Sequence, residues 1–395
     1  MAAIAELPQE LITIILSKLP VKSLLRFKCV CKSWYSLIKS PNFIHLHLNN
    51  SSSNHNCIMV RCCIDSIEQE IGCFPQVLSF YSHETLADLG IQFDTPFPNS
   101  FGFYNVSGPC NGLICMTKNT DQILIINPAT REFRSLFVPQ PGYYFDTVAF
   151  GLDPNSGEYK VVMIGVHYDH TRYPSYDEQM YDSPFHPPLF RGAREAVVYD
   201  FSTDSWRETG IVFPEPFNYS QKSITLNGAF HWMPVGAYRN VPILSFRISD
   251  EVIESIPLPG FYSWEHENHF SDLFVLNKSL ALVFYYVYEC YEISVMNEYG
   301  VKDSWAKLVK LGPMPFALTP LAFWNSNDED MLLLEGKTDV ESPIYDGHLI
   351  SCSLQHQTVK HFPIYGDVSS TLQNTFDVFM YSESLVSVNS IGKSA

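Results

Sequence analysis

Basic side chains are scarce in this 395-residue chain. Lys and Arg number 25 against 42 Asp and Glu, which gives a formal net charge of −17. Nucleic-acid binding needs clustered Lys and Arg that displace counterions from phosphates. The shortage therefore argues against a DNA or RNA partner, and a molecule this acidic suits a basic protein partner better.

Several other patterns are missing. No run of 18 uncharged apolar residues occurs, so we expect no membrane span. The start MAAIAELPQE lacks the features of a secretory signal, so we expect a cytoplasmic or nuclear protein. The ten cysteines form no CxxC pair and no paired Cys/His spacing, so we expect neither a metal site nor a cofactor. No Gly-rich phosphate loop with Lys, HExxH or GxSxG motif is present, so we expect a protein that is not an enzyme.

The chain has the composition of a folded protein with two electrically different parts. It is 46% hydrophobic, 14% aromatic and only 17% charged, the opposite of a disordered chain. Residues 1–50 hold six Lys or Arg against Glu6 and Glu10, a net charge of +4, so the other 345 residues carry −21. The two parts therefore face different partners.

Short helices are predicted for the first fifty residues. Pro8 and Pro20 bracket one at residues 9–18, and others follow at about 21–29 and 31–39, with a final turn from Pro41. The first helix is apolar on two faces, which is typical of a helix packed on both. About 45 residues are too few to bury so many large apolar groups. Either these helices dock on the rest of the chain or they await a partner subunit.

Three segments in this region, LPQEL at 7–11, LPVKSLLR at 19–26 and VCKSW at 30–34, resemble an F-box in order and spacing. The resemblance implies a three-helix domain at residues 1–48 that binds a Skp-type adaptor and, through it, the cullin and RING subunits of a ubiquitin ligase. Adaptors of this family are acidic, which would explain the basic residues at the rim of the interface. The adaptor-binding residues that the resemblance implies are Leu7, Pro8, Leu11, Ile15, Leu16, Leu19, Val21, Leu24, Leu25 and Trp34. Trp34 could equally belong to the core of the domain.

A polar stretch at 49–56, NNSSSNHN, is interpreted as a flexible linker, and residues 57–390 are predicted to be all β. Tight-turn signals between apolar runs recur about every 50 residues, except for one step of about 70 residues that contains an insertion. They lie at Asn111-Gly112, Asn155-Ser156-Gly157, Asn227-Gly228, Asn277-Lys278 and Asp328-Glu329-Asp330. A second hairpin follows in most units. Four strands per unit of this length predict a kelch-like β-propeller of about six blades, with a β-sandwich as the alternative. Residues 57–105 would supply a less regular blade, and FDVFMYSESLVSV near the C-terminus would supply the closing strand.

The segments GPCNGLICM, INPATREFRSL, FGLDPNSGEYKVV and VYDFSTDSWRE resemble the F-box-associated domain of plant F-box proteins, including the S-locus F-box group. The resemblance implies the substrate receptor of an SCF (Skp–cullin–F-box) ubiquitin ligase, with a basic S-RNase as target in self-incompatibility. The alternatives are another plant turnover or signalling pathway, a non-degradative interaction protein, and an enzyme on the propeller axis.

An aromatic and acidic insertion interrupts the third unit near residues 167–192. Tyrosines provide contact area at low entropic cost, and carboxylates can pair with Lys or Arg on a target. The alternative is a proline-broken loop that contacts nothing specific. The predicted substrate-binding residues are Tyr168, Tyr173, Tyr176, Asp177, Glu178, Tyr181 and Phe185.

Overall fold

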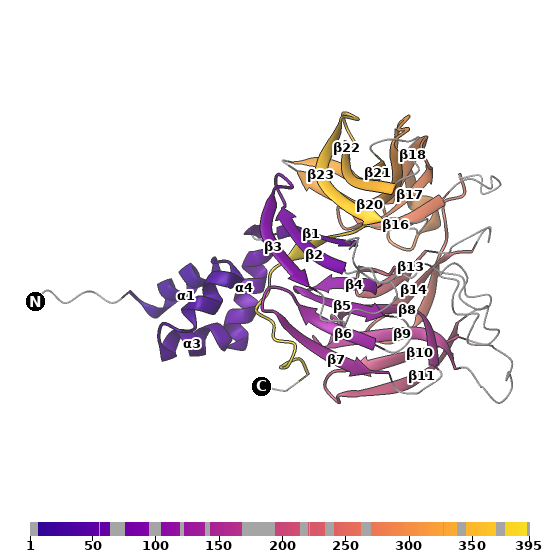
Figure 1. Cartoon of the computed structure of the whole chain (residues 1–395). Helices are drawn as coiled ribbons and strands as arrows, with labels where there is room; N and C mark the ends of the chain where they lie inside the picture. Colours follow the sequence, from indigo (N-terminus) through magenta and orange to yellow (C-terminus); the bar gives the residue numbers. More distant parts are fainter. Residues whose placement is uncertain are drawn as a thin grey trace, which may run out of the picture.

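The computed structural model describes residues 7–54, 56–63, 76–94, 104–118, 122–138, 143–167, 194–213, 220, 222–233, 241–261, 270–326, 328–337, 345–368 and 376–392. Within them, four helices precede a ring of β-sheets (Figure 1). We call residues 9–54 the helical module. Its helices are α1 (Gln9–Ser17), α2 (Val21–Phe27), α3 (Lys32–Lys39) and α4 (Pro41–Asn54).

Helix α4 corrects two expectations. The predicted final turn is a helix that begins at Pro41 and ends at Asn54, so the module has four helices rather than three. The stretch interpreted as a flexible linker is mostly the end of this helix, and β1 begins at Asn56. Asn and Ser have low helix propensity, but packing overrides it: α4 contacts α1, and the Asn50 amide donates to Ser17 Oγ at 2.8 Å.

The described strands form six four-stranded antiparallel sheets, which are the blades of a propeller. Blade 1 is the sheet that holds the first strand, β1, and the blades are numbered along the chain from there. Within each blade the strands are named in spatial order, from the strand nearest the axis to the outermost one. Blade 1 holds β24 (Phe376–Ser382), β1 (Asn56–Cys63), β2 (Gln76–Ser82) and β3 (Asp88–Asp94). Blade 2 holds β4 (Tyr104–Cys110), β5 (Leu113–Lys118), β6 (Gln122–Asn127) and β7 (Glu132–Phe137). Blade 3 holds β8 (Tyr143–Leu152), β9 (Tyr159–His167), β10 (Arg194–Asp200) and β11 (Ser205–Phe213).

The other three blades repeat this order. Blade 4 holds β12 (Ile224–Leu226), β13 (Ala229–Trp232), β14 (Ile243–Arg247) and β15 (Ile253–Ile256). Blade 5 holds β16 (Phe270–Leu276), β17 (Ser279–Tyr286), β18 (Cys290–Met296) and β19 (Trp305–Leu311), with a 3-10 turn, η2 (Lys302–Ser304), before β19. Blade 6 holds β20 (Ala317–Ser326), β21 (Glu329–Lys337), β22 (Tyr345–Ser353) and β23 (Val359–Val368). The predicted propeller is therefore confirmed, with six blades.

Hairpin turns at the predicted sites join the first two strands in each of blades 2 to 6. Both central residues have positive φ at Asn111-Gly112, Asn227-Gly228 and Asn277-Lys278, the geometry of a tight two-residue hairpin. In blade 3 the Asp153 carboxylate accepts hydrogen bonds from the backbone N–H groups of Asn155 and Ser156 and from the Ser156 hydroxyl, and Gly157 takes a φ of +72°. The local sequence therefore specifies these turns.

The ring closes between distant parts of the chain. Strand β24 pairs with β1 in blade 1, with Arg61 directly opposite Asp377, so the predicted closing strand is confirmed. Contacts between first strands run from β4 to β8, from β12 through β16 and β20 to β24, and back to β4. The first strand of each blade therefore faces the axis. Apolar side chains pack between the blades, and a separate cluster forms the core of the helical module.

Candidate adaptor-binding and target-binding surfaces

One face of α1 is apolar and exposed. Leu7, Leu11, Ile14 and Ile15, which we call the adaptor face, are 58%, 46%, 50% and 52% exposed. The other face is packed: Ile12 and Leu16 contribute to the core of the helical module. Large apolar side chains gathered on one helix face are typical of a protein-binding surface.

The ten predicted adaptor-binding residues do not all lie on this surface. Leu16, Val21 and Leu24 are buried in the core of the module, together with Ile38 and Phe43. In this structure these three residues pack the helices and are not exposed to a partner. Leu19, Leu25 and Trp34 are partly buried around the same core, and Trp34 packs edge-on against Phe27 with ring centroids 5.5 Å apart. Pro8 is exposed and directly precedes α1, where it needs no N–H partner. Sequence reasoning missed Ile14, although it lies one turn from Leu11 on the same helix face.

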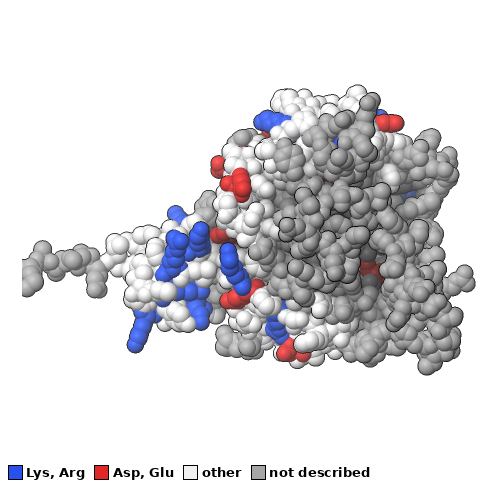
Figure 2. All heavy atoms as spheres, in the orientation of Figure 1, with Lys and Arg blue, Asp and Glu red and all other residues white. Residues whose placement is uncertain are grey.

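Basic side chains gather on the helical module, whereas the described surface of the propeller in the same view carries fewer of them (Figure 2). They are Lys18, Lys22, Arg26, Lys28, Lys32 and Lys39. These five lysines and the arginine give the helical module a net positive charge, whereas the rest of the chain has a net negative charge. A surface of this kind attracts an acidic partner over a distance of about a Debye length, roughly 8 Å at physiological salt.

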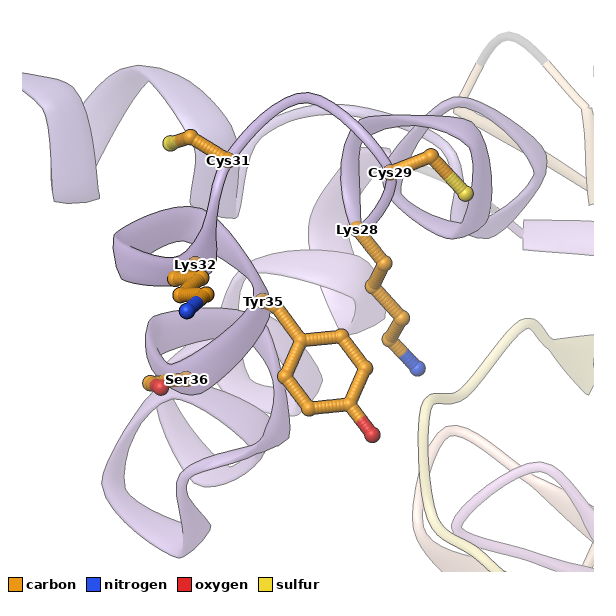
Figure 3. A pocket seen from close by; sticks show the side chains of 6 residues that line it. All are labelled: Lys28, Cys29, Cys31, Lys32, Tyr35 and Ser36. Carbon is orange, nitrogen blue, oxygen red and sulfur yellow. The ribbon is translucent and has the colours of Figure 1, made fainter.

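A recess of about 500 Å³ lies where α2 leads into α3, lined by Lys28, Cys29, Cys31, Lys32, Tyr35 and Ser36 (Figure 3). Lys39 Nζ donates to the Tyr35 hydroxyl at 2.8 Å, which lowers the pKa of Tyr35 and raises that of Lys39. Burial and the neighbouring Lys39 charge lower the pKa of Lys28. Cys31 is exposed, and hydrogen bonds from the Ser33 hydroxyl and from backbone N–H groups of α3 lower the pKa of its thiol. The recess is therefore positively charged and continues the basic surface.

An ion cluster spans the axis of the propeller. Lys222, just before β12 in blade 4, places Nζ 2.6 Å from Asp377 Oδ1 at the start of β24 in blade 1. These blades lie on opposite sides of the ring. Arg61 Nε also donates to Asp377 Oδ2 at 2.7 Å, and Asp272 accepts from the Tyr285 hydroxyl at 3.1 Å. We call Arg61, Lys222, Asp272 and Asp377 the axial cluster.

The charges of the axial cluster largely neutralise one another. Burial opposes ionisation of Asp377, but Arg61 and Lys222 outweigh it and hold the pKa of this carboxyl below its usual value. The Lys222 side chain is 43% exposed, and its partial burial lowers the pKa of the amine, but the attraction of Asp377 more than offsets this, so that the pKa is raised. Burial raises the pKa of Asp272. This balance is typical of a structural ion network, and sequence reasoning missed it because its members are far apart along the chain.

The predicted substrate-binding residues, Tyr168, Tyr173, Tyr176, Asp177, Glu178, Tyr181 and Phe185, lie outside the described residues. The positions at which the insertion leaves and rejoins the propeller are described. His167 ends β9 and pairs with Tyr143 at the start of the inner strand β8, and Arg194 Nε lies 3.2 Å from Asp146 Oδ2. The insertion therefore starts from the end of the propeller at which the inner strands begin.

The helical module lies at the other end of the propeller (Figure 1). The inner strands β4 and β24 finish there, and the Tyr381 hydroxyl of β24 donates to the backbone oxygen of Gly112 in the β4–β5 turn at 3.3 Å. The chain after β24 then contacts the helices. The adaptor face and the roots of the insertion are thus at opposite ends of the molecule.

Within the described residues, no helix is long and apolar enough to cross a membrane. No group of three or more His, Cys, Asp or Glu side chains in the same part of the chain could hold a metal ion.

Comparisons with known proteins identify the family. Residues 4–46 match the F-box domain, and residues 86–388 match the F-box associated beta propeller domain. The second match covers most of the chain, so this protein belongs to the family of F-box proteins with an F-box associated β-propeller. Strands β1 and β2 of blade 1 precede that match, whereas β3 and β24 of the same blade lie within it.

Curated relatives agree with this assignment. F-box protein At3g07870 of Arabidopsis thaliana is 30% identical over 331 residues, which cover 78% of this chain and 72% of the relative. F-box/kelch-repeat protein At3g23880 of the same plant is 26% identical over 413 residues, covering 98% and 96%. Among solved structures, an oligogalacturonate lyase in complex with manganese has a TM-score of 0.44 at 12% identity, covering 76% of this chain and 73% of the lyase. The family assignment rests on the domain matches and on the plant relatives.

Proposed function

We propose that this protein is the target-binding subunit of an SCF ubiquitin ligase. In this proposal the adaptor face binds a Skp-type adaptor, which recruits the cullin and RING subunits, and the propeller holds a target protein for ubiquitination. The observation that supports it most is the exposed apolar face of α1 within a matched F-box domain. Family members of this kind act as receptors and leave the chemistry to their partner subunits, so we propose no catalytic role for the chain.

The basic surface supports an acidic adaptor. Lysines around an apolar contact speed the encounter with a partner of negative charge, whereas the buried apolar residues supply most of the binding affinity. We therefore expect adaptor association to slow as salt rises, with a smaller change in the dissociation rate.

The adaptor proposal is tested with the purified full chain and a purified Skp-type adaptor. Replacing Leu11 and Ile15 by Asp places two charges in the proposed contact, and we expect at least about a 30-fold weaker Kd, the loss typical of interface hot spots. Leu308→Asp is the matched control, because Leu308 is a 54% exposed leucine on β19 of the propeller. Undiminished binding of the α1 variant in a titration calorimeter would remove the adaptor face from the proposal.

We further propose that the target is a basic protein and that the insertion between β9 and β10 contributes to binding it. The acidic charge of the propeller and the residue types of the insertion support this. The S-locus resemblance makes an S-RNase in pollen a specific candidate, with cytoplasmic encounter of receptor and target. No catalytic, cofactor or metal requirement enters this proposal.

Affinity purification of the full chain from pollen and from leaf, with proteasome inhibition, tests the target. A basic secreted ribonuclease recovered from pollen together with adaptor and cullin would support the S-RNase candidate; unrelated proteins with adaptor and cullin would discard it and keep the receptor role. If the chain is instead a non-degradative interaction protein, the abundance of its target should not change when the proteasome is inhibited. Deleting residues 168–185 should abolish target recovery and keep the adaptor, and an unchanged target would exclude the insertion.

A further inference from the structure

The chain returns to the helical module after it has closed the propeller. Residues 383–391, which follow β24 and which we call the strut, run between the helices and blade 2 (Figure 1). Ser384 and Leu385 are buried, as are Val388 and Ile391 further along. A segment so close to the chain end is usually poorly ordered unless specific contacts hold it. The strut has such contacts on both sides.

Hydrogen bonds hold the strut on the propeller. The Asn127 amide at the end of β6 donates to the backbone oxygens of Ser384 and Val386 at 3.0 and 2.7 Å. Glu132 at the start of β7 accepts from the Ser387 hydroxyl at 2.6 Å and from the Val388 N–H at 3.1 Å. These side chains belong to the INPATRE segment of the sequence, whose asparagine also closes its own turn by accepting from the Ala129 N–H at 3.0 Å.

Close packing adds to these hydrogen bonds. Val388 and Ile391 enter the apolar cluster between blades 2 and 3. Gly112, at the tip of the β4–β5 hairpin, passes so near the strut that a Cβ there would lie 2.3 Å from Ser384 Cβ. The strut therefore has a fixed course over the propeller.

On its other side the strut completes the helical module. Glu383 Oε2 accepts a hydrogen bond from the Val21 N–H at 3.1 Å. The first N–H groups of a helix need outside acceptors, and Pro20, which precedes α2, has no side chain that can serve. Leu385 packs into the module core with Leu16 and Val21. The core of the module thus includes a residue from the far end of the chain.

We propose that the strut locks the helical module to the propeller in one orientation. The adaptor face then keeps a fixed orientation relative to the propeller, and the two ends of the molecule keep a constant separation. The inference that the orientation is fixed rests on these contacts alone. Its consequence rests on the proposed function: a target held at the far end of the propeller would meet the ubiquitin-charged subunits at a defined distance, which limits the lysines within reach.

The test uses the full chain without adaptor or target, so that its failure is distinct from failure of the proposed function. Spin labels on unnatural amino acids at the exposed Ser36 of α3 and Asp303 of η2 report the distance between module and propeller. We expect one narrow distance distribution for the otherwise unchanged chain and a broad one after Glu383→Ala with Leu385→Ala. Asn389→Ala, an exposed change in the same segment, is the matched control and should keep the narrow distribution.

Hydrogen exchange provides the second measurement. Loss of the carboxylate acceptor should make the amides at the start of α2 exchange at least about tenfold faster, because a hydrogen bond to a charged group is being removed. Peptides from β6 and β7 should be unaffected. If the double variant loses its β-sheet circular dichroism, the same two measurements on Glu383→Ala alone test the proposal, because this variant keeps the Leu385 side chain in the core. An unchanged distance distribution and unchanged exchange in the folded variant would overturn the proposal.

Discussion

Burial keeps His231 neutral. The ring is enclosed on β13, where Nδ1 lies 3.1 Å from the Ile224 backbone oxygen and Nε2 lies 2.6 Å from the Tyr299 hydroxyl. A carbonyl oxygen only accepts, so Nδ1 carries the proton and Nε2 accepts from Tyr299. Burial lowers the pKa of His231 to about 4.

We expect this histidine to make the protein less stable in acid. The unfolded chain takes up the proton near pH 6.5, whereas the folded chain resists until about pH 4. The stabilisation by neutral His231 is therefore complete above pH 6.5 and is lost as the pH falls towards 4, by up to about 3 kcal/mol. Urea unfolding of the unmodified chain and of His231→Gln at pH 7 and pH 4.5 measures this. A variant with the same pH dependence as the unmodified chain would contradict the assignment.

Tryptophans on two outer strands make the same contact with the blade before them. Trp206 of β11 donates Nε1–H to the backbone oxygen of Phe137, the last residue of β7, at 2.7 Å. Trp305 of β19 donates to the oxygen of Pro257, just after β15, at 2.9 Å. Phe133, at a similar place on β7, has no such group and is 52% exposed. Trp206 and Trp305 thus each link their blade to the blade before it.

Replacing either tryptophan by Phe removes the Nε1–H donor but keeps an aromatic ring, so the change in stability separates the contribution of the hydrogen bond from that of ring packing. We expect Trp206→Phe to cost about 0.5–1 kcal/mol, the usual net value of a neutral hydrogen bond. Trp305→Phe should cost more, about 1–3 kcal/mol, because Trp305 is only 6% exposed and the smaller ring leaves space. Denaturant midpoints measure both. Equal midpoints for all three proteins would refute the linking role.

At the scale of elements, the sequence predicted what is determined locally. The Asn-Gly turns were recognisable because a positive φ at two adjacent residues favours these residue types, and the starts of α1 and α2 were recognisable because a proline precedes each. The end of α4 was predicted wrongly as a linker, since its stability comes from contacts with α1 that composition does not reveal. Which face of α1 is exposed was equally undetermined, because Leu385 lies at the other end of the sequence and completes the packed side.

In the molecule as a whole, the axial cluster joins blade 1 to blades 4 and 5, which are not its neighbours in the ring. Lys222 comes from blade 4, Asp272 from blade 5, and Arg61 and Asp377 from blade 1. Ser223 adds a contact to blade 2, with its Oγ 3.2 Å from Ser107 Oγ. No periodicity in the sequence pairs such positions, because only ring closure brings them together.

Replacing Lys222 by Met should destabilise the closed ring. It leaves the buried Asp377 carboxylate with Arg61 alone, and since the Lys222 side chain is 43% exposed we expect about 1–3 kcal/mol, less than for a fully buried pair. Lys310→Met is the matched control: Lys310 is 62% exposed, lies 2.9 Å from Glu292, and should cost under about 1 kcal/mol. Chemical unfolding measures the difference, and equal losses would argue against a role in closure.

Strand β24 and the strut complete both parts of the molecule, and the ribosome makes them after the other strands of the propeller. The helices leave the ribosome first, but the acceptor for the Val21 N–H and the last apolar side chain of their core arrive some 360 residues later. The same late stretch closes blade 1. A premature stop codon anywhere before Phe376 would therefore yield a chain that lacks both the strand that closes blade 1 and the residues that complete the helical module.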